Sequence, residues 1–255
     1  MPWSAKEIAE RVLRELRGTA VITLGPGLPA RIADLLDASQ PPMIFCENGV
    51  LGAGPKPSAG KGDPDVTDAT GAPITLRPGG AYLDAVESFS LIRGGHVDVC
   101  VLTADQVDQD GNLAGGPPAQ GGAPGGGGAA DLAAGARRLI VAMEHSDGAG
   151  RSRLLDRCTS PLIAAEAVGT VVTNLGVFKV AGGAFLCVEI APGTRWEDVV
   201  SSTAGTLLGP PELGPEVLAE PSAPSQGEDD EEGGLVAESD WEEGSDQPKE
   251  GLGTS

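Results

Sequence analysis

Short apolar runs alternate with helical patterns along most of this chain, and this alternation constrains the fold more than any other feature. The expected strands are nearly continuous aliphatic runs at 20–24, 43–46, 97–102, 139–143, 170–173, 178–180 and 184–190. The expected helices lie near 5–17, 30–38, 81–92, 129–136 and 196–204. Apolar strands separated by helices are typical of a parallel sheet with both faces covered. We therefore predict an α/β fold with a mostly parallel sheet flanked by helices.

Local signals sharpen two of these boundaries. Ser4 and Glu7 stand at the spacing of a capping box, so the first helix should begin just after Ser4 and end near Gly18. The Gly182-Gly183 pair between the last two strands predicts an antiparallel hairpin. Residues 53–71 show no periodicity and are expected to be irregular.

Composition indicates a cytoplasmic protein with an aliphatic core. Hydrophobic residues make up 40% of the chain but aromatic residues only 3%, so Ala, Val, Leu and Ile must fill the interior. No apolar run reaches the roughly 18 residues of a membrane span, and the N-terminus lacks a signal-peptide pattern. The cysteines are far apart and show no metal-ligand spacing, which predicts reduced thiols and no metal site: Cys46, Cys100, Cys158 and Cys187.

Acidic residues concentrate at the C-terminal end. Residues 219–255 hold twelve Asp or Glu and one lysine, out of a net charge of −20 for the whole chain. Such a segment cannot bury enough apolar surface to fold. We expect a folded domain over 1–218 and a disordered acidic tail over 219–255. The acidic balance argues against nucleic-acid binding, which needs a basic surface.

The hexapeptide 47–52 (ENGVLG) places a carboxylate where an apolar strand runs into a glycine turn. A carboxylate in this position can be tuned by burial and by turn dipoles. Glu47 could attack an activated acyl group and form a mixed anhydride. Alternatively, Glu47 only accepts hydrogen bonds from the backbone of the turn.

Residues 115–128 hold eight glycines and lead into an expected helix. Backbone N–H groups at such a helix start can bind an anion or a developing oxyanion. The alternative is a flexible surface loop. No Gly-Lys-Ser/Thr follows, so a nucleotide-triphosphate loop is excluded.

Two further patterns favour structural roles. Residues 108–112 (DQDGN) resemble part of a calcium loop but lack its terminal Glu, so a tight turn is expected. His96 and His145 have no Ser or Cys partner in sequence and are expected to be structural hydrogen-bonding groups.

Five stretches, in order, resemble the beta subunit of class I CoA-transferases of the 3-oxoacid type. They are 24–29 (LGPGLP), 47–52 (ENGVLG), 88–98 (SFSLIRGGHVD), 106–114 (QVDQDGNLA), and 127–132 with 143–145 (GGAADL and MEH). The resemblance covers residues 4–208 without large gaps. It does not include the acidic tail.

The resemblance implies a CoA-transferase fold and ping-pong transfer of CoA between an acyl-CoA, such as succinyl-CoA, and a 3-oxoacid. Glu47 would be the nucleophile and would carry CoA as a glutamyl-CoA thioester. Asn48, Gly127 and Gly128 would bind substrate or CoA, with the Gly128 N–H at the oxyanion. Coenzyme A is then a substrate and no separate cofactor is implied.

The family also needs an alpha subunit, so a hetero-oligomer with that partner is expected. Its other partners would be acyl-CoA and carboxylate substrates. The nearest cations to the glycine-rich segment are Arg137 and Arg138, which either contact the CoA phosphates or are solvated surface charges.

This chain departs from the family pattern around the expected site. Gly115-Gly116 stand where Asn-Trp is usual, Gly121 replaces a lysine, and Cys46 replaces the serine before the glutamate. The loss of a tryptophan and a lysine removes packing and a cation near an anionic ligand. A second hypothesis is therefore a catalytically weakened paralogue that acts as an interaction subunit.

Overall fold

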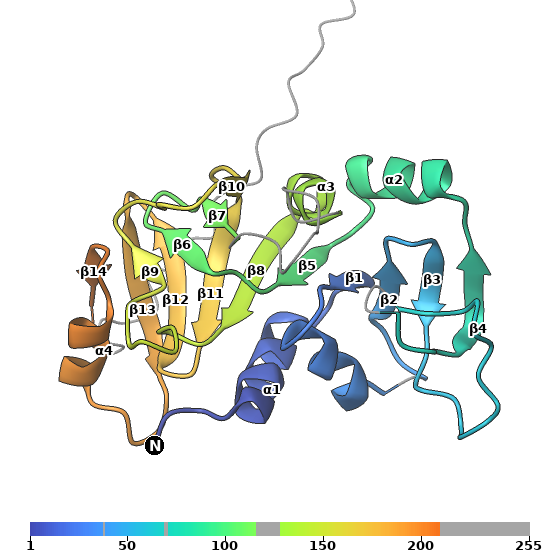
Figure 1. Ribbon diagram of the computed structural model, residues 1–255, viewed down its shortest axis with the longest axis horizontal. Helices are drawn as coiled ribbons and strands as arrows, with labels where there is room; N and C mark the ends of the chain where they lie inside the picture. Colours follow the sequence, from blue (N-terminus) through green and yellow to red (C-terminus); the bar gives the residue numbers. More distant parts are fainter. Residues whose placement is uncertain (38, 69–70, 116–127, 210–255) are drawn as a thin grey trace, which may run out of the picture. The chain divides into compact units, whose positions relative to one another are not determined.

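A ten-stranded sheet organises the structure, a computed structural model that describes residues 1–37, 39–68, 71–115 and 128–209 (Figure 1). Its order is β14-β13-β12-β11-β8-β5-β1-β2-β3-β4. The five central strands are parallel: β1 (Val21–Leu24), β2 (Met43–Cys46), β5 (Val99–Leu102), β8 (Arg138–Met143) and β11 (Val168–Thr173). The predicted α/β fold with a mostly parallel sheet is confirmed.

Antiparallel strands extend both sides of this parallel centre. β3 (Val50–Ala53) and β4 (Leu76–Tyr82) follow β2. On the other side, β12 (Gly176–Ala181) and β13 (Ala184–Ile190) form the predicted hairpin, and β14 (Leu207–Leu208) runs parallel to β13. Gly182 and Gly183 both have positive φ, 60° and 73°, as a tight hairpin turn requires.

Hydrophobic clusters cover both faces of the sheet. Successive residues of β5 alternate between them, because strand side chains point to opposite faces. Val99 and Val101 join one cluster with α1 (Ala5–Glu15) and the 3-10 helix η1 (Pro29–Leu35). Cys100 and Leu102 join the other, with α2 (Ala85–Arg93), α3 (Ala129–Gly135) and α4 (Trp196–Ser202). Burial on both faces explains why the central strands are continuous apolar runs.

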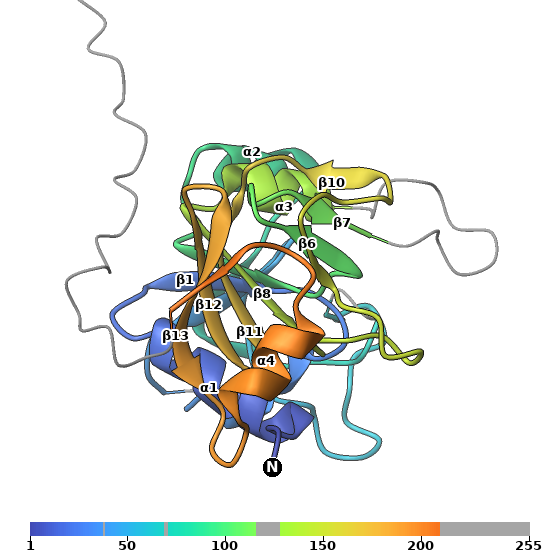
Figure 2. The same cartoon turned by 90° about the vertical axis from the view of Figure 1, so that its left-hand side faces the viewer.

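A smaller four-stranded sheet lies beside α3 (Figure 2). Its order is β10-β7-β6-β9. The strands are very short: β6 (Gln106–Asp108), β7 (Leu113–Ala114), β9 (Leu154–Leu155) and β10 (Leu162–Ala164). It packs on the cluster that also contains α2 and α3 residues, through Val107, Leu113 and Leu154.

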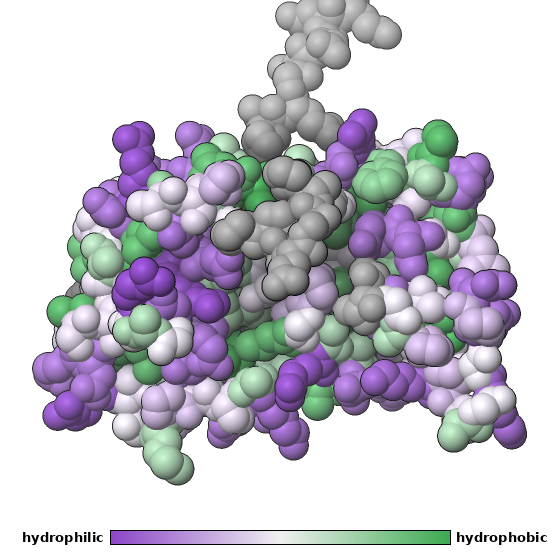
Figure 3. All heavy atoms as spheres, viewed as in Figure 1, coloured by the Kyte–Doolittle hydropathy of each residue, from purple (hydrophilic) through white to green (hydrophobic). Residues whose placement is uncertain are grey.

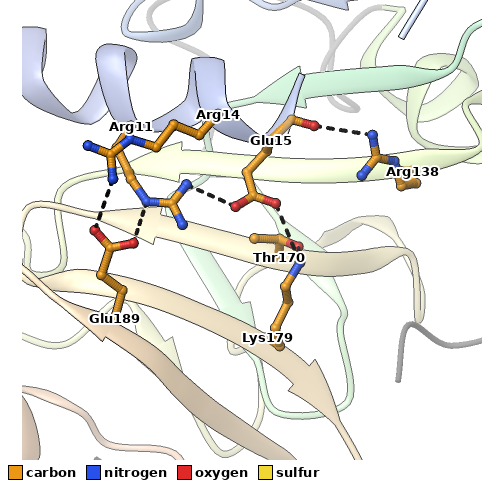
Figure 4. A network of polar contacts seen from close by, with 7 residues as sticks. All are labelled: Arg11, Arg14, Glu15, Arg138, Thr170, Lys179 and Glu189. Carbon is orange, nitrogen blue, oxygen red and sulfur yellow. Dashed lines mark hydrogen bonds and ion pairs between the residues drawn. The ribbon is translucent and has the colours of Figure 1, made fainter. Parts of the chain in front are cut away.

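A polar network fixes α1 to the sheet (Figure 4). Arg11, only 9% exposed, donates from Nε to Glu189 at 2.6 Å and from Nη1 to Glu15 at 2.9 Å. Lys179 lies 3.5 Å from Glu15, and Arg138 donates to the Glu15 carbonyl oxygen at 3.2 Å. Burial opposes ionisation of Glu15, but Arg11 and Lys179 hold its pKa below the usual value. The buried guanidinium is therefore paired, as a buried charge must be.

Two expected helices differ from the structure. The helix expected over 81–92 is wrong at its start, since Ala81 and Tyr82 belong to β4 and α2 begins at Ala85. Asp84 sets this start, because its carboxylate accepts the Glu87 N–H at 2.8 Å in a capping box. The helix expected over 30–38 is a 3-10 helix, Pro29–Leu35.

Other local expectations are confirmed. Ser4 and Glu7 form the capping box of α1, and Gly18 follows the helix end with a φ of 78°. Cys46, Cys100 and Cys187 are buried thiols in strands, and Cys158 is half-buried.

Within the described ranges, no helix combines the length and apolar character needed to cross a membrane. The predicted boundary at 218 and the acidic tail lie outside the described residues.

Candidate active site around Glu47

Glu47 occupies the tight turn between β2 and β3, at the carboxyl end of a central parallel strand. The Gly49 N–H donates to the Cys46 carbonyl at 3.0 Å, which closes the turn. Gly49 has a φ of 106°, and a Cβ there would collide with the carbonyl oxygen of Leu83. The glycine of the motif is therefore required both for its conformation and for space.

Contacts from two other segments hold the backbone of this turn. Ser88 Oγ, on the buried side of α2, donates to the Glu47 carbonyl oxygen at 2.7 Å. Leu83 N–H donates to the Gly49 carbonyl at 2.8 Å. The Asn48 side-chain amide donates to the Thr67 carbonyl at 2.8 Å. Asn48 is thus next to Glu47, but its amide is engaged by the loop that leads to β4.

The Glu47 side chain packs against Gly128, the N-cap residue of α3. A Cβ placed on Gly128 would lie 3.1 Å from Glu47 Cγ and 3.9 Å from its carboxyl carbon Cδ. The structure thus brings together two predicted site residues that are far apart in sequence. Gly127, the other residue of the glycine-rich segment predicted for the site, lies outside the described residues.

The Glu47 charge also acts on a residue of β5, the strand on the far side of β1 from β2. Burial raises the pKa of the Cys100 thiol, and the negative charge of Glu47 raises it further. Cys100 is fully buried, so it stays a protonated thiol at neutral pH. Cys100 therefore offers no thiolate nucleophile beside the half-buried carboxylate of Glu47.

Known proteins are similar to this chain over most of its described length. The model of the family described as Coenzyme A transferase matches residues 5–202. The chain belongs to the coenzyme A transferase family. The beta subunit of the acetate CoA-transferase from Escherichia coli (strain K12) is 44% identical over 198 residues, 78% of this chain and 90% of that protein. The B subunit of the 3-oxoadipate CoA-transferase from Pseudomonas putida is 38% identical over 206 residues, 80% of this chain and 96% of that protein.

A solved coenzyme A transferase has the same fold. The apoenzyme of an acyl-CoA transferase from Escherichia coli O157:H7 matches 82% of this chain with a TM-score of 0.65 and 22% identity. This chain spans only 42% of the length of that protein. The two relatives described above are beta or B subunits covered over almost their full length, so within the family the chain corresponds to that subunit.

The family segment 106–114 forms a turn built around a buried carboxylate. Asp108 accepts from the Asn112 N–H and side-chain amide, both at 3.0 Å, and from the Cys158 N–H at 3.0 Å. Burial opposes ionisation, but these donors hold the pKa of Asp108 below its usual value. Gly111 allows the turn with a φ of 83°. The expected tight turn is confirmed, and it joins β6 to β7 immediately before the glycine-rich segment.

The two histidines of this coenzyme A transferase lie in different environments. His145 is 1% exposed, with Nδ1 3.0 Å from Thr173 Oγ1 and Nε2 3.0 Å from Thr203 Oγ1. Burial lowers the pKa of His145 to about 4, so the ring is neutral. His145 has the structural role that was expected. His96 is exposed at the end of the turn after α2.

The described contacts of Arg137 and Arg138, the arginines nearest the glycine-rich segment, are made with residues other than Glu47. Arg137 donates from Nε to the Gly95 carbonyl at 2.9 Å and lies 3.5 Å from Asp98. Arg138 begins β8 and reaches α1, on the opposite face of the sheet from α3. These contacts favour structural roles for both side chains.

A shallow groove of about 460 Å³ lies along α2, the helix that contacts the Glu47 turn. Apolar and polar side chains line it in equal number: Ala85, Val86, Phe89, Ser90, Arg93 and Asp131. Figure 3 shows hydrophobic and hydrophilic residues side by side over α2. Val86 is 75% exposed, and Arg93 pairs with Asp131 of α3 at 2.7 Å. Glu47 does not line this groove, so the groove and the carboxylate are separate features.

The sequence alone did not indicate the roles of Ser88 and Cys100. Ser88 lies in a stretch that resembles the family, but nothing in the sequence shows that its hydroxyl turns toward Glu47. Cys100 is one apolar residue in a buried strand, and only strand order places it near the carboxylate.

Proposed function

We propose that this chain is the beta subunit of a coenzyme A transferase that moves CoA between an acyl-CoA, such as succinyl-CoA, and a 3-oxoacid. The observation that carries the proposal is the packing of Glu47 against Gly128 at the start of α3. A carboxylate at the end of a central strand and beside a helix start has the position expected of a nucleophile in an α/β protein.

The proposed transfer has two matching halves. A Glu47 carboxylate oxygen attacks the thioester carbonyl carbon of the donor, and the carbon–sulfur bond breaks to release CoA thiolate. The thiolate then attacks the Glu47 carbonyl carbon of the mixed anhydride. This step releases the donor's carboxylate and leaves a glutamyl-CoA thioester. The acceptor carboxylate repeats the two steps in the opposite direction, which forms the new acyl-CoA and restores Glu47.

Gly128 and Asn48 have supporting roles in this scheme. Glycine at 128 leaves no Cβ against Glu47, so the acyl group can approach the carboxylate from that side. The N–H groups of a helix's first turn have no partner within the helix and favour developing negative charge, and Gly128 stands at such a start in α3. Asn48 links the Glu47 turn to Thr67 and restricts the turn on its exposed side. Gly127 would complete the oxyanion-binding backbone.

An alpha subunit is the proposed partner. The relatives named above are themselves beta or B subunits. The acyl-CoA transferase of the same fold is more than twice as long as the matched region. We expect the purified chain alone to show no transferase turnover, and co-expression with an alpha subunit to give a stable hetero-oligomer with activity. Size-exclusion chromatography and a coupled transferase assay measure both outcomes.

Trapping of the enzyme-bound thioester tests the nucleophile. The assembled enzyme is incubated with succinyl-CoA, reduced with borohydride and analysed by peptide mass spectrometry. Glu47 should be the only residue converted. Glu47→Gln should lower turnover by roughly three orders of magnitude or more, because covalent catalysis is lost. Glu10→Gln is the matched control, since Glu10 forms an exposed pair with Lys6 on α1.

Conversion of a different residue, or near-normal turnover by Glu47→Gln, would refute the assignment. A correctly assembled wild-type complex without turnover on any donor would instead support an interaction subunit. A panel of acyl-CoA donors and carboxylate acceptors, including acetate, acetoacetate and 3-oxoadipate, identifies the acid pair. The 3-oxoacid assignment fails if only simple fatty acids accept CoA.

A further inference from the structure

Ser88 is a fully buried polar residue whose hydroxyl donates a hydrogen bond to the Glu47 turn. A helical serine can satisfy its hydroxyl on the carbonyl four residues earlier. Ser90 does so in the same helix, since its Oγ donates to the Val86 carbonyl at 2.7 Å. Ser88 is 0% exposed and instead donates to the Glu47 carbonyl oxygen, also at 2.7 Å. Its hydrogen bond therefore joins α2 to the turn that carries Glu47.

The same helix holds the other side of the candidate site. Arg93, at the end of α2, donates from Nε and Nη2 to Asp131 of α3 at 3.0 and 2.7 Å. Gly135 of α3 lies so close to the Ile92 carbonyl that a Cβ there would collide with it. Gly128, the N-cap residue of α3, contacts Glu47. A closed set of contacts thus runs from Glu47 through α2 and α3 and back to Glu47.

We propose that Ser88 is a positioning residue. Its hydrogen bond to the Glu47 carbonyl oxygen sets the position of the Glu47 carboxylate relative to Gly128. This inference rests on the proposed function, in which Glu47 is the nucleophile. Among the described residues, the turn is otherwise held by the Cys46–Val50 pairing that flanks it and by hydrogen bonds of Gly49 and the exposed Asn48. A displacement of about 1 Å in a reacting group can cost about a hundredfold in rate, so one buried hydrogen bond to the nucleophile's own carbonyl matters.

Ser88→Ala and Ser90→Ala are compared in the assembled complex. Both substitutions remove a hydroxyl of α2 that donates a hydrogen bond of 2.7 Å, but only the Ser88 hydroxyl bonds to the Glu47 turn. We expect Ser88→Ala to slow formation of the glutamyl-CoA adduct by roughly 10- to 100-fold in single-turnover experiments. The KM for the acyl-CoA donor should stay within about twofold, and Ser90→Ala should match wild type.

Thermal unfolding of each variant separates positioning from general loss of structure. An unchanged midpoint with slower adduct formation supports the proposal. Should Ser88→Ala not fold, Ser88→Cys keeps the side-chain volume with a weaker donor and should show the same slow adduct formation. A wild-type adduct rate in the folded variant overturns the proposal, as does a loss shared equally by Ser90→Ala.

The failure of this inference is distinguishable from failure of the proposed function. If Glu47→Gln still forms an adduct, then Glu47 is not the nucleophile. If Glu47→Gln forms none while Ser88→Ala forms it at the wild-type rate, then the function stands and Ser88 has no positioning role.

Discussion

His145 should make the stability of this protein depend on pH in a way that one substitution removes. Its ring is buried between Thr173 and Thr203 and lies 5.3 Å from the ring of Phe178. Burial lowers the pKa of His145 in the folded protein from 6.5 to about 4. As pH falls below 6.5, the unfolded chain therefore binds a proton that the folded protein does not. Stability is lost as pH falls through this window, and the loss ends near pH 4.

The magnitude follows from the width of the window. Each unit of pKa difference corresponds to about 1.4 kcal/mol, so His145 should remove about 3 kcal/mol of unfolding free energy between pH 6.5 and pH 4. Above pH 6.5 the ring is neutral in both states and contributes no pH dependence. The loss is a large fraction of the stability of a typical domain.

Urea unfolding followed by circular dichroism measures this effect in the wild type and in His145→Gln. The variant starts from a lower stability at pH 7.5, because it loses a hydrogen bond and ring packing. Carboxylates titrate in both proteins, so their contribution cancels in the difference. The wild-type curve should fall more steeply, by about 1.4 kcal/mol per pH unit between pH 6.5 and pH 4. Parallel curves would show that His145 titrates with the same pKa in the folded and unfolded states and would refute the reasoning.

Three further predictions concern glycines and the tail. Gly49→Ala should destabilise the protein by at least twice as much as Gly60→Ala in thermal or urea unfolding. Both glycines have positive φ, but only at position 49 would the added Cβ also collide with a carbonyl oxygen. Equal effects of the two substitutions would contradict this prediction. Gly128→Ala should lower kcat by about tenfold and leave the unfolding midpoint unchanged, because the added Cβ would lie only 3.1 Å from Glu47 Cγ and displace that side chain. An unchanged kcat would show that the Glu47 side chain adjusts to the added Cβ at no cost. Deletion of 220–255 should leave turnover and unfolding within error, and limited proteolysis should cut there first; a drop in either property would assign the tail a structural role.

Several parts of the fold follow directly from the sequence. The five central strands were predictable, because a strand buried on both faces needs a continuous apolar run and few other segments have one. The capping box at Ser4 was equally readable, since the signal is local, whereas the one at Asp84 was not recognised from the sequence. The Gly182-Gly183 hairpin belongs to the same class.

The strands that were not predicted have no such signal. β6, β7, β9, β10 and β14 contain two or three residues each, which is too short to show a period. β4 contains Pro78, Gly79 and Gly80, residues that disfavour strands, and it exists because β3 pairs with it. Pairing partners far along the chain decided these segments.

The candidate site divides in the same way. The motif around Glu47 identified the carboxylate, because a glycine turn after an apolar strand can be read locally. Its nearness to Gly128 and Cys100, and the Ser88 hydroxyl on its carbonyl, depend on strand order and on the packing of α2 against α3. Sequence can supply the chemical groups of a site, whereas contacts between residues tens of positions apart form only when the chain closes its loops around a common core.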